Sequence, residues 1–369
     1  SGMNTKGWAF VVSAGTRLAD EAYFDGTNYK AIAGFISVEK KINRHHSLNF
    51  SGFYTPNSRA KNSPNTAEVT QLTNEKYNSY WGFQNRKKRN ARVKNIEEPI
   101  LMLNHFFNIN DYTTLNSSLT YQFGKITNSN IDYQNGNSPD PTYYKKMPSY
   151  YSSLYAKDNG EFSGEFTPDY VNAEKSKEQF LANNQIDWNA LYYANQSPIL
   201  DSNGNVIGYT PGKSHYVLYE DRTDDQTVTA NSTFNTQIND NLYVTAGGFF
   251  SILKSHNYQQ LTDLLGGSYF DDIDVFYSGD QAQSDLNHPN RQVVEGDTYG
   301  YNFNYLANTL NLFTNFKFTY DNVDFYLAQN FISSNYQREG LYQNGIYATN
   351  SFGKSEKVHF DNFGFKGGI

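Results

Sequence analysis

Five positive charges lie within seven residues of this chain, on Arg86, Lys87, Lys88, Arg89 and Arg92. Guanidinium and ammonium groups at this spacing bind phosphate or carboxylate groups through charge-assisted hydrogen bonds. The run is therefore a candidate site for an anionic substrate or for phosphates at a membrane surface. A solvated loop face, or ion pairs with acidic loop residues, accounts for the same run without any ligand.

Two pairs of aromatic residues are further candidates, one close before the basic run and one much later in the chain. Tyr80 and Trp81 precede it, and Tyr143 and Tyr144 follow it. Their rings could stack on sugars or aromatic ligands, although ordinary packing between loops explains them equally well. The predicted ligand-binding residues are Tyr80, Trp81, Arg86, Lys87, Lys88, Arg89, Arg92, Tyr143 and Tyr144.

Motifs for catalysis are missing from the sequence, and those for metal binding are weak. Asp271, Asp272 and Asp274 could hold Ca²⁺, which takes several carboxylate oxygens, but they lack EF-hand spacing and also fit a solvated acidic loop. The seven histidines are scattered, without the zinc-binding i, i+4 pair and its glutamate. There is no cysteine, nucleophile elbow, phosphate-binding loop or dinucleotide fingerprint. We expect no enzyme, no catalytic or metal-site residues, and no cofactor apart from Ca²⁺ in a loop.

The composition indicates strands with one apolar and one polar face. Aromatic residues make up 17% of the 369 residues, yet the mean hydropathy is −0.71. A globular core would contain more Leu, Ile and Val, and a disordered chain would lack the aromatics. The net charge of −7 argues against nucleic acid as a partner.

Segments that target or anchor a chain are also missing. No apolar run reaches the 18 residues of a transmembrane helix candidate. The first residues, Ser1–Asn4, show neither the positive region nor the apolar region of a signal peptide. We expect a mature chain, a truncated chain or a piece of a longer protein.

Strict alternation predicts strands, most clearly at Val228–Ile238. Its even positions are mostly apolar and its odd positions are all polar, so one face must contact water. The whole chain contains about ten strands of this kind, and most of them are joined in pairs by short polar turns. These turns lie at Lys41–Ser47, Asn108–Tyr112, Ile238–Asn241 and Tyr320–Asn322.

The connections at the other ends of these strands are very different in length. Long loops are expected at about residues 57–98, 127–223 and 257–300, with Ala19–Gly26 as a short connection on the same side. Short turns on one side and long loops on the other are typical of an outer-membrane β-barrel. We predict an all-β fold, an antiparallel transmembrane barrel. A soluble sandwich or propeller also alternates, but its strands are usually about 5–6 residues long.

Residues in two further sets follow from this interpretation. The largest loop contains a helical pattern over Asn172–Asn195, and the residues that could share one face of it are Phe180, Leu181, Trp188, Leu191 and Tyr192. The polar positions expected to face the barrel lumen are Asn49, Ser51, Asn116, Thr120, Asn231, Thr233 and Asn235.

Several strings in the first 200 residues or so resemble TonB-dependent outer-membrane receptors of the Bacteroidota type. The resemblance rests on Gly7–Phe10, Tyr23–Gly26, Tyr80–Asn85 with the basic run to Pro99, Pro139–Tyr144 with Pro148–Tyr151, and Gln185–Trp188 with Leu191 and Tyr192. It implies a 22-stranded barrel, plugged by an N-terminal domain, that imports nutrients with energy relayed by TonB. The ligand stays open among siderophore, glycan, peptide and vitamin.

The chain departs from that family pattern in ways that predict a fragment. No plug domain and no TonB box occur, and the last residues, Phe365–Ile369, lack the usual terminal aromatic. About ten strands cannot close a 22-stranded barrel, so residues 1–369 are expected to be an internal part of the barrel. Its partners would then be the missing plug and remaining strands, TonB, outer-membrane lipid and lipopolysaccharide, and a surface lipoprotein or larger complex.

The function expected from all of this is uptake across the outer membrane of a Gram-negative bacterium. Extracellular loops would capture the ligand, and the polar lumen would admit it. Two alternatives stay open: a passive porin or surface adhesin with the same barrel, and a soluble β-rich binding module. Dependence on TonB separates the first from uptake by a receptor, and stability in plain buffer identifies the second.

Overall fold

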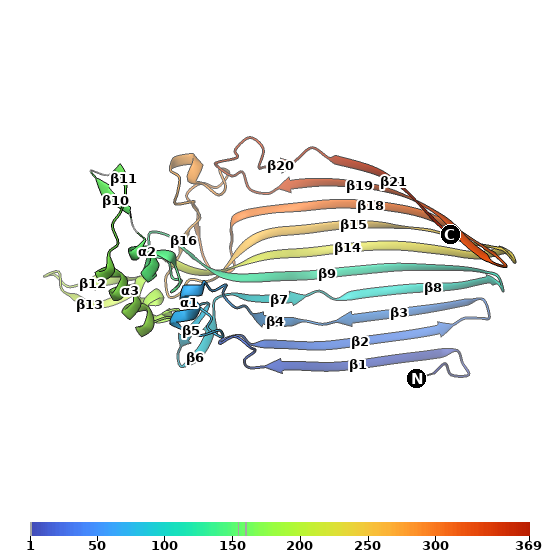
Figure 1. The fold of residues 1–369 in the computed structure, drawn as a ribbon, viewed down its shortest axis with the longest axis horizontal. Helices are drawn as coiled ribbons and strands as arrows, with labels where there is room; N and C mark the ends of the chain where they lie inside the picture. Colours follow the sequence, from blue (N-terminus) through green and yellow to red (C-terminus); the bar gives the residue numbers. More distant parts are fainter. Residues whose placement is uncertain (1, 154, 159–160) are drawn as a thin grey trace.

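The computed structural model describes residues 2–153, 155–158 and 161–369. Its main feature is one antiparallel sheet of thirteen strands (Figure 1). The strands are β1 (Trp8–Ala19), β2 (Tyr29–Lys41), β3 (His46–Tyr54), β4 (Asn57–Ala60), β7 (Val93–Glu97), β8 (Ile100–Asn110), β9 (Thr113–Tyr133), β14 (Tyr216–Asn239), β15 (Leu242–Asp263), β18 (Thr298–Tyr320), β19 (Val323–Gly340), β20 (Gly353–Lys354) and β21 (Val358–Gly368).

Three of the lines across this sheet are interrupted, so the thirteen strands follow ten lines. β3 and β4 both pair with β2, β7 and β8 both pair with β9, and β20 and β21 both pair with β19. Pro56 separates β3 from β4, and Pro99 separates β7 from β8. A proline has no N–H to give to the ladder, which explains both breaks. The predicted number of about ten strands therefore agrees with the lines of the sheet.

Figure 1 shows the asymmetry between the two ends of the sheet. The turns between β2 and β3, β8 and β9, β14 and β15, and β18 and β19 lie together at one end. The β1–β2 connection lies at the opposite end, beside the folded loops. This arrangement follows from the antiparallel order, in which each strand returns the chain to the other end.

The loops fold into an assembly of short helices and hairpins at that opposite end. The helices are α1 (Ala67–Leu72), η1 (Tyr144–Lys146), α2 (Pro148–Ser152), α3 (Tyr170–Ala182), α4 (Trp188–Ala194) and η2 (Gly279–Ala282). The hairpins are β5 (Trp81–Gln84) with β6 (Lys87–Asn90), β10 (Tyr155–Asp158) with β11 (Glu161–Phe166), β12 (Gln196–Leu200) with β13 (Val206–Pro211), and β16 (Phe270–Asp271) with β17 (Gln292–Val293). None of the helices among the described residues is long and apolar enough to cross a membrane.

The predicted loop ranges were too wide, because the strands of the sheet extend into them. The 57–98 range contains β4 and β7, the 127–223 range contains the last residues of β9 and the first of β14, and the 257–300 range is shortened by β15 and β18. Near the loops both faces of β14 are covered: the consecutive residues Tyr216 and Val217 point to opposite faces, and each is buried in a different cluster. Alternation between a wet and an apolar face therefore fades there, and the sequence pattern resembles that of a loop.

The single helix predicted over Asn172–Asn195 is in fact two. Asp187 is the N-cap of α4. Its side chain accepts a hydrogen bond from the Ala190 N–H, and this contact starts a new helix after the end of α3. The expected shared face is also divided. Phe180 packs in one buried cluster, whereas Trp188 and Leu191 pack in another.

The buried core lies in the loop assembly and the adjoining strand ends. Each of its three clusters joins residues from different loops, as when Val69 of α1 meets Phe180 of α3. The sheet itself has exposed apolar side chains instead. Strand pairing forms one row of neighbours on a single face, in which each residue is opposite the next. The row runs through Phe50, Leu103, Leu119, Ala230 and Phe250, on β3, β8, β9, β14 and β15. Leu103 is 47% exposed and Leu119 is 51% exposed.

Candidate functional site

The other face of the sheet carries all seven residues that the sequence predicts for the lumen. Direct pairing joins Asn49 to Asn104, Ser118 and Asn231 in one row across β3, β8, β9 and β14. The remaining positions lie at even spacing from that row, so the register puts the following residues on one face: Asn49, Ser51, Asn116, Thr120, Asn231, Thr233 and Asn235.

Side chains on this polar face bond to one another. The Asn49 amide donates to Ser37 Oγ at 2.8 Å, and the Oδ1 of Asn49 accepts from Ser51 Oγ at 2.8 Å and from Asn104 Nδ2 at 3.2 Å. Thr245 Oγ1 donates to Asn235 Oδ1 at 3.0 Å. These amides and hydroxyls form a neutral polar surface on this face of the sheet.

The basic run of the sequence forms the β5–β6 hairpin. Asn85 and Arg86, with φ of 51° and 66°, make its two-residue turn, the backbone geometry that favours tight hairpins. Arg86 and Lys87 are exposed at the tip. Among the described residues neither of them forms an ion pair. They are therefore the members of the run that a ligand in solution can reach most easily.

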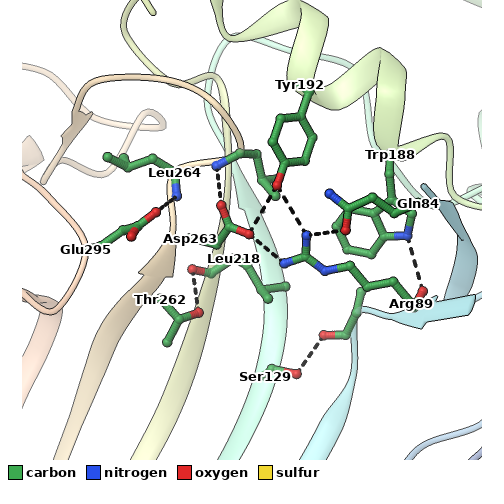
Figure 2. A network of polar contacts seen from close by, with 12 residues as sticks. Gln84, Arg89, Ser129, Trp188, Tyr192, Leu218, Thr262, Asp263, Leu264 and Glu295 are labelled. Atoms are coloured by element: carbon green, nitrogen blue, oxygen red, sulfur yellow. Dashed lines mark hydrogen bonds and ion pairs between the residues drawn. The ribbon is translucent and has the colours of Figure 1, made fainter. Parts of the chain in front are cut away.

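Arg89 is instead engaged by its own protein (Figure 2). Its Nη2 lies 2.7 Å from Asp263 Oδ2, and its Nη1 donates to Gln84 Oε1 at 2.8 Å. The guanidinium carbon lies 4.4 Å from the centre of the Trp188 ring, and the Trp188 Nε1 donates to the Arg89 carbonyl. Tyr192 completes the group through its hydroxyl. Arg89 thus fastens the hairpin to α4 and to the end of β15.

Replacing Arg89 by methionine is expected to loosen this junction by about 1–3 kcal/mol, because Asp263 and Gln84 lose a charged donor in a half-buried site. Hydrogen exchange of the β5–β6 amides measures the effect. Arg86→Met at the exposed turn is the matched control and should change stability by less than about 0.5 kcal/mol. Equal protection in the two variants would contradict the assignment.

Lys88 and Arg92 also have partners within the loop assembly. Lys88 Nζ lies 2.6 Å from Glu21 Oε1 and 4.7 Å from the centre of the Trp81 ring. The Arg92 guanidinium lies over the Tyr80 ring at 4.5 Å. The structure therefore divides the predicted basic site: three of its five cations contact aromatic rings or acids of the protein, and two project from the turn.

Acidification is expected to weaken the Glu21–Lys88 contact. The hydrogen bond from Lys88, followed by the Gly26 N–H, holds the pKa of Glu21 below its ordinary value of 4.5. A lowered pKa in the folded state means that the stabilisation is complete above the ordinary pKa and is lost as the pH falls through the folded pKa. The Gly26 amide should lose protection in that range. Glu21→Gln should show low, pH-independent protection; a pH response that persists in it would contradict the mechanism.

The two predicted aromatic pairs lie in separate settings. The Tyr143 and Tyr144 rings are 4.8 Å apart, and Tyr144 continues to the Tyr150 ring at 5.6 Å. Among the described residues no ring contact joins them to Tyr80 or Trp81, although the neighbouring Thr142 Oγ1 donates to Ser79 Oγ at 3.4 Å. Trp81 is buried, so its face is not available for stacking on a ligand.

A cavity of about 620 Å³ lies beside the tyrosine chain, within the loop assembly. Tyr151, Lys146, Phe180 and Tyr216 are among its lining residues, whereas Tyr143 and Tyr144 are not. Burial lowers the pKa of Lys146, whose ammonium donates to the Ser138 carbonyl at 2.6 Å. The cavity is thus a second polar and aromatic surface that the sequence did not indicate.

The acidic run proposed for Ca²⁺ makes contacts with cations of the protein. Asp271 pairs with Lys213, and Asp272 Oδ2 lies 3.0 Å from Arg291 Nη2. Asp274 Oδ1 accepts from the Phe276 N–H at 2.9 Å. Within the part of the chain that the structure describes, no three His, Asp or Glu side chains are grouped closely enough to hold a metal ion.

Asn195 makes five side-chain hydrogen bonds within the loop assembly, and no sequence motif indicated it. It is 1% exposed. Its amide donates to the carbonyls of Tyr216, Leu264 and Leu265 at 2.7–3.1 Å, and its Oδ1 accepts from the N–H groups of His215 and Tyr216. It joins the end of α4 to the start of β14 and to the segment after β15. Its partners lie 20 to 70 residues away, so only the folded chain reveals the role.

Comparisons with known proteins support the fold. No protein-family profile and no curated protein matches the sequence. Among solved structures, the FpvAI–pyocin S2 complex aligns with a TM-score of 0.50 at 9% identity, over 97% of this chain and 36% of that one. The open form of the ferric-catecholate import receptor Fiu from E. coli K12 aligns with a TM-score of 0.48 at 11% identity, over 99% of this chain and 47% of that one. The ferripyoverdine receptor of the outer membrane of Pseudomonas aeruginosa aligns with a TM-score of 0.49 at 9% identity, over 97% of this chain and 35% of that one.

The chain spans less than half the length of these three structures. At 9% identity the first match shows a shared fold and nothing about ligand or mechanism. The fold class predicted from the sequence, an all-β antiparallel sheet of the outer-membrane barrel type, is confirmed. The total of 22 strands stays a prediction.

Proposed function

We propose that this chain is part of the barrel of a TonB-dependent uptake receptor in the outer membrane of a Gram-negative bacterium. The single observation that carries the proposal is the two-faced sheet. One face presents a continuous row of exposed apolar side chains, and the other presents amides and hydroxyls that bond to one another. Lipid against the first face and water against the second satisfy both.

The lengths and connections of the strands support the same function. β9, β14, β15 and β18 have 21 to 24 residues, about twice the 9–11 that a tilted strand needs to cross a bilayer. The part nearest the short turns would span the membrane, and the remainder would carry the loops outward. In this orientation the four short turns lie in the periplasm, and the folded loop assembly lies outside the cell.

The sheet requires further protein to function in a membrane. β1 pairs only with β2, and β21 pairs only with β19, so β1 and β21 lie at the edges of the described sheet. Lipid cannot satisfy the hydrogen-bonding groups of an open edge. We infer that other strands of a parent protein close the barrel and that a separate plug domain fills it. TonB would act on the plug, and lipopolysaccharide or a surface lipoprotein would contact the loops. The resemblance of the first 200 residues or so to Bacteroidota receptors favours that lineage.

Planar-bilayer conductance of the complete parent protein tests the transport mechanism. A plugged receptor is expected to stay closed and to form photo-cross-links with TonB in cells. Steady conductance without any TonB cross-link would establish the passive porin instead. A parent protein that stays monomeric in buffer without detergent would refute the membrane assignment and leave the soluble binding module. No catalytic role is proposed.

A further inference from the structure

Four positive side chains gather on the polar face of the sheet, next to the loop assembly. Arg59 of β4 pairs directly with Lys94 of β7, and the Lys61 N–H donates to the Arg92 carbonyl one pair further along. Residues two apart on a strand share a face. Lys94 is opposite Asn128 of β9, which lies at even spacing from Asn116 and Thr120. The cationic cluster of Arg59, Lys61, Arg92 and Lys94 therefore belongs to the predicted lumen face.

The charges of this cluster are poorly balanced by the chain. None of its four members forms an ion pair within the described ranges. Asp221, opposite Asn128 on β14, is the carboxylate on the same row, and it already accepts from the Tyr301 hydroxyl at 2.9 Å and from Gln259 at 3.3 Å. Like charges directly opposite each other on two strands destabilise a sheet. A protein of net charge −7 thus concentrates four cations where they repel one another.

Burial and the neighbouring charges both act on Lys61, which lies just outside β4. Its pKa is lowered, first by burial and then by the charges of Lys94, Arg92 and Arg59, with Asp221 opposing them. A bound anion would remove this cost. With an anion bound, the charged form of Lys61 would be favoured despite the positive charges around it.

Two members of the cluster are held in place by neutral neighbours. Lys61 Nζ donates to Asn128 Oδ1 at 2.7 Å, which leaves its other N–H groups available. The Arg92 guanidinium lies over the Tyr80 ring at 4.5 Å, with its planar edge available for a bidentate contact. Positioned donors reduce the entropy that a ligand must lose on binding. Tyr80 and Arg92, both predicted as ligand residues from the sequence, thus meet at this cluster.

We propose that the cationic cluster binds a soluble ligand carrying carboxylate or phosphate groups, at the point where the lumen opens to the loops. The proposal rests on the receptor function above and specifies the chemical class of its ligand. Arg59 and Lys94 provide paired charges across two strands, and Lys61 and Arg92 provide oriented donors. The apolar face carries the lipid contacts, so a lipid headgroup is not the source of the anion.

Calorimetric titration of the complete receptor in detergent with citrate, and separately with inorganic phosphate, tests the proposal. At least one of the two probes is expected to bind, and affinity should fall as salt is added. The double variant Arg59→Gln with Lys94→Gln should weaken binding at least tenfold. Lys30→Gln is the matched control, because Lys30 lies on the adjacent strand β2 but pairs with Ser58 and faces the other side. It should leave affinity unchanged.

The outcomes separate this proposal from the receptor function. A heat-modifiable gel shift equal to that of the unmodified receptor shows that each variant is folded. Failure of both probes to bind, or equal loss in Lys30→Gln, overturns the anion site and leaves the receptor function standing. Conductance without TonB cross-links overturns the receptor function, whatever the titration gives.

Discussion

Leu119→Arg is expected to block assembly of the barrel. Leu119 lies six residues into β9 from the short turn, near the middle of a span of about 9–11 residues, and is 51% exposed on the apolar face. Arginine at the midplane of a barrel's lipid face costs about 2–4 kcal/mol. Refolding into lipid vesicles, followed by the heat-modifiable gel shift, measures the folded fraction.

The adjacent residue provides the control for this change. Thr120 points to the opposite face, where it pairs with Met102 and Thr229. Thr120→Arg adds the same charge one residue away and should be nearly silent for assembly. If the two arginines reduce folding equally, the sheet does not separate lipid from water. If only Thr120→Arg fails, the facing is reversed.

The second large effect is expected at Asn195. Asn195→Leu keeps the approximate size but leaves three buried carbonyls and two buried N–H groups without this partner. Each unsatisfied buried group costs about 1–3 kcal/mol, so a partial loss on the order of 4 kcal/mol is expected for the loop assembly. Hydrogen exchange at His215, Tyr216 and Leu265 measures it.

Asn189→Leu is the control for Asn195. Asn189 lies on the exposed side of the same short helix, α4. Asn189→Leu should leave the exchange pattern unchanged. The barrel should still assemble in both variants, because the partners of Asn195 all lie at the loop end of the sheet. A loss of the whole barrel in Asn195→Leu would show that loops and sheet fold as one unit, contrary to this expectation.

The sheet was predictable from the sequence wherever its faces meet different solvents. Val228–Ile238 alternates between an apolar and a polar face, and the register of this pattern holds over β9, β14 and β15. The short turns were predictable for a related reason, since two polar residues are enough to reverse such strands. β4 and β7 escaped prediction because Pro56 and Pro99 interrupt their lines and resemble loop punctuation.

The candidate sites were less predictable, because long-range contacts decide them. The run from Arg86 to Arg92 looked like one site, yet Arg89 meets Asp263, 174 residues away. The cationic cluster was missed because two of its cations belong to β4 and β7, which looked like loop segments. Asn195 has no local signal, since any asparagine in a loop looks alike until its buried partners are known.

One measurement examines the two-faced sheet most directly: a spin-label scan along β14. The chain has no cysteine, so single cysteines introduced from Val228 to Ile238 in the complete receptor can each carry a label. In a bilayer, labels at even positions such as Phe234 should be accessible to oxygen dissolved in lipid. Labels at odd positions such as Asn235 should not be. A two-residue period is expected throughout; equal access to a water-soluble relaxant at both sets would contradict a membrane-spanning sheet.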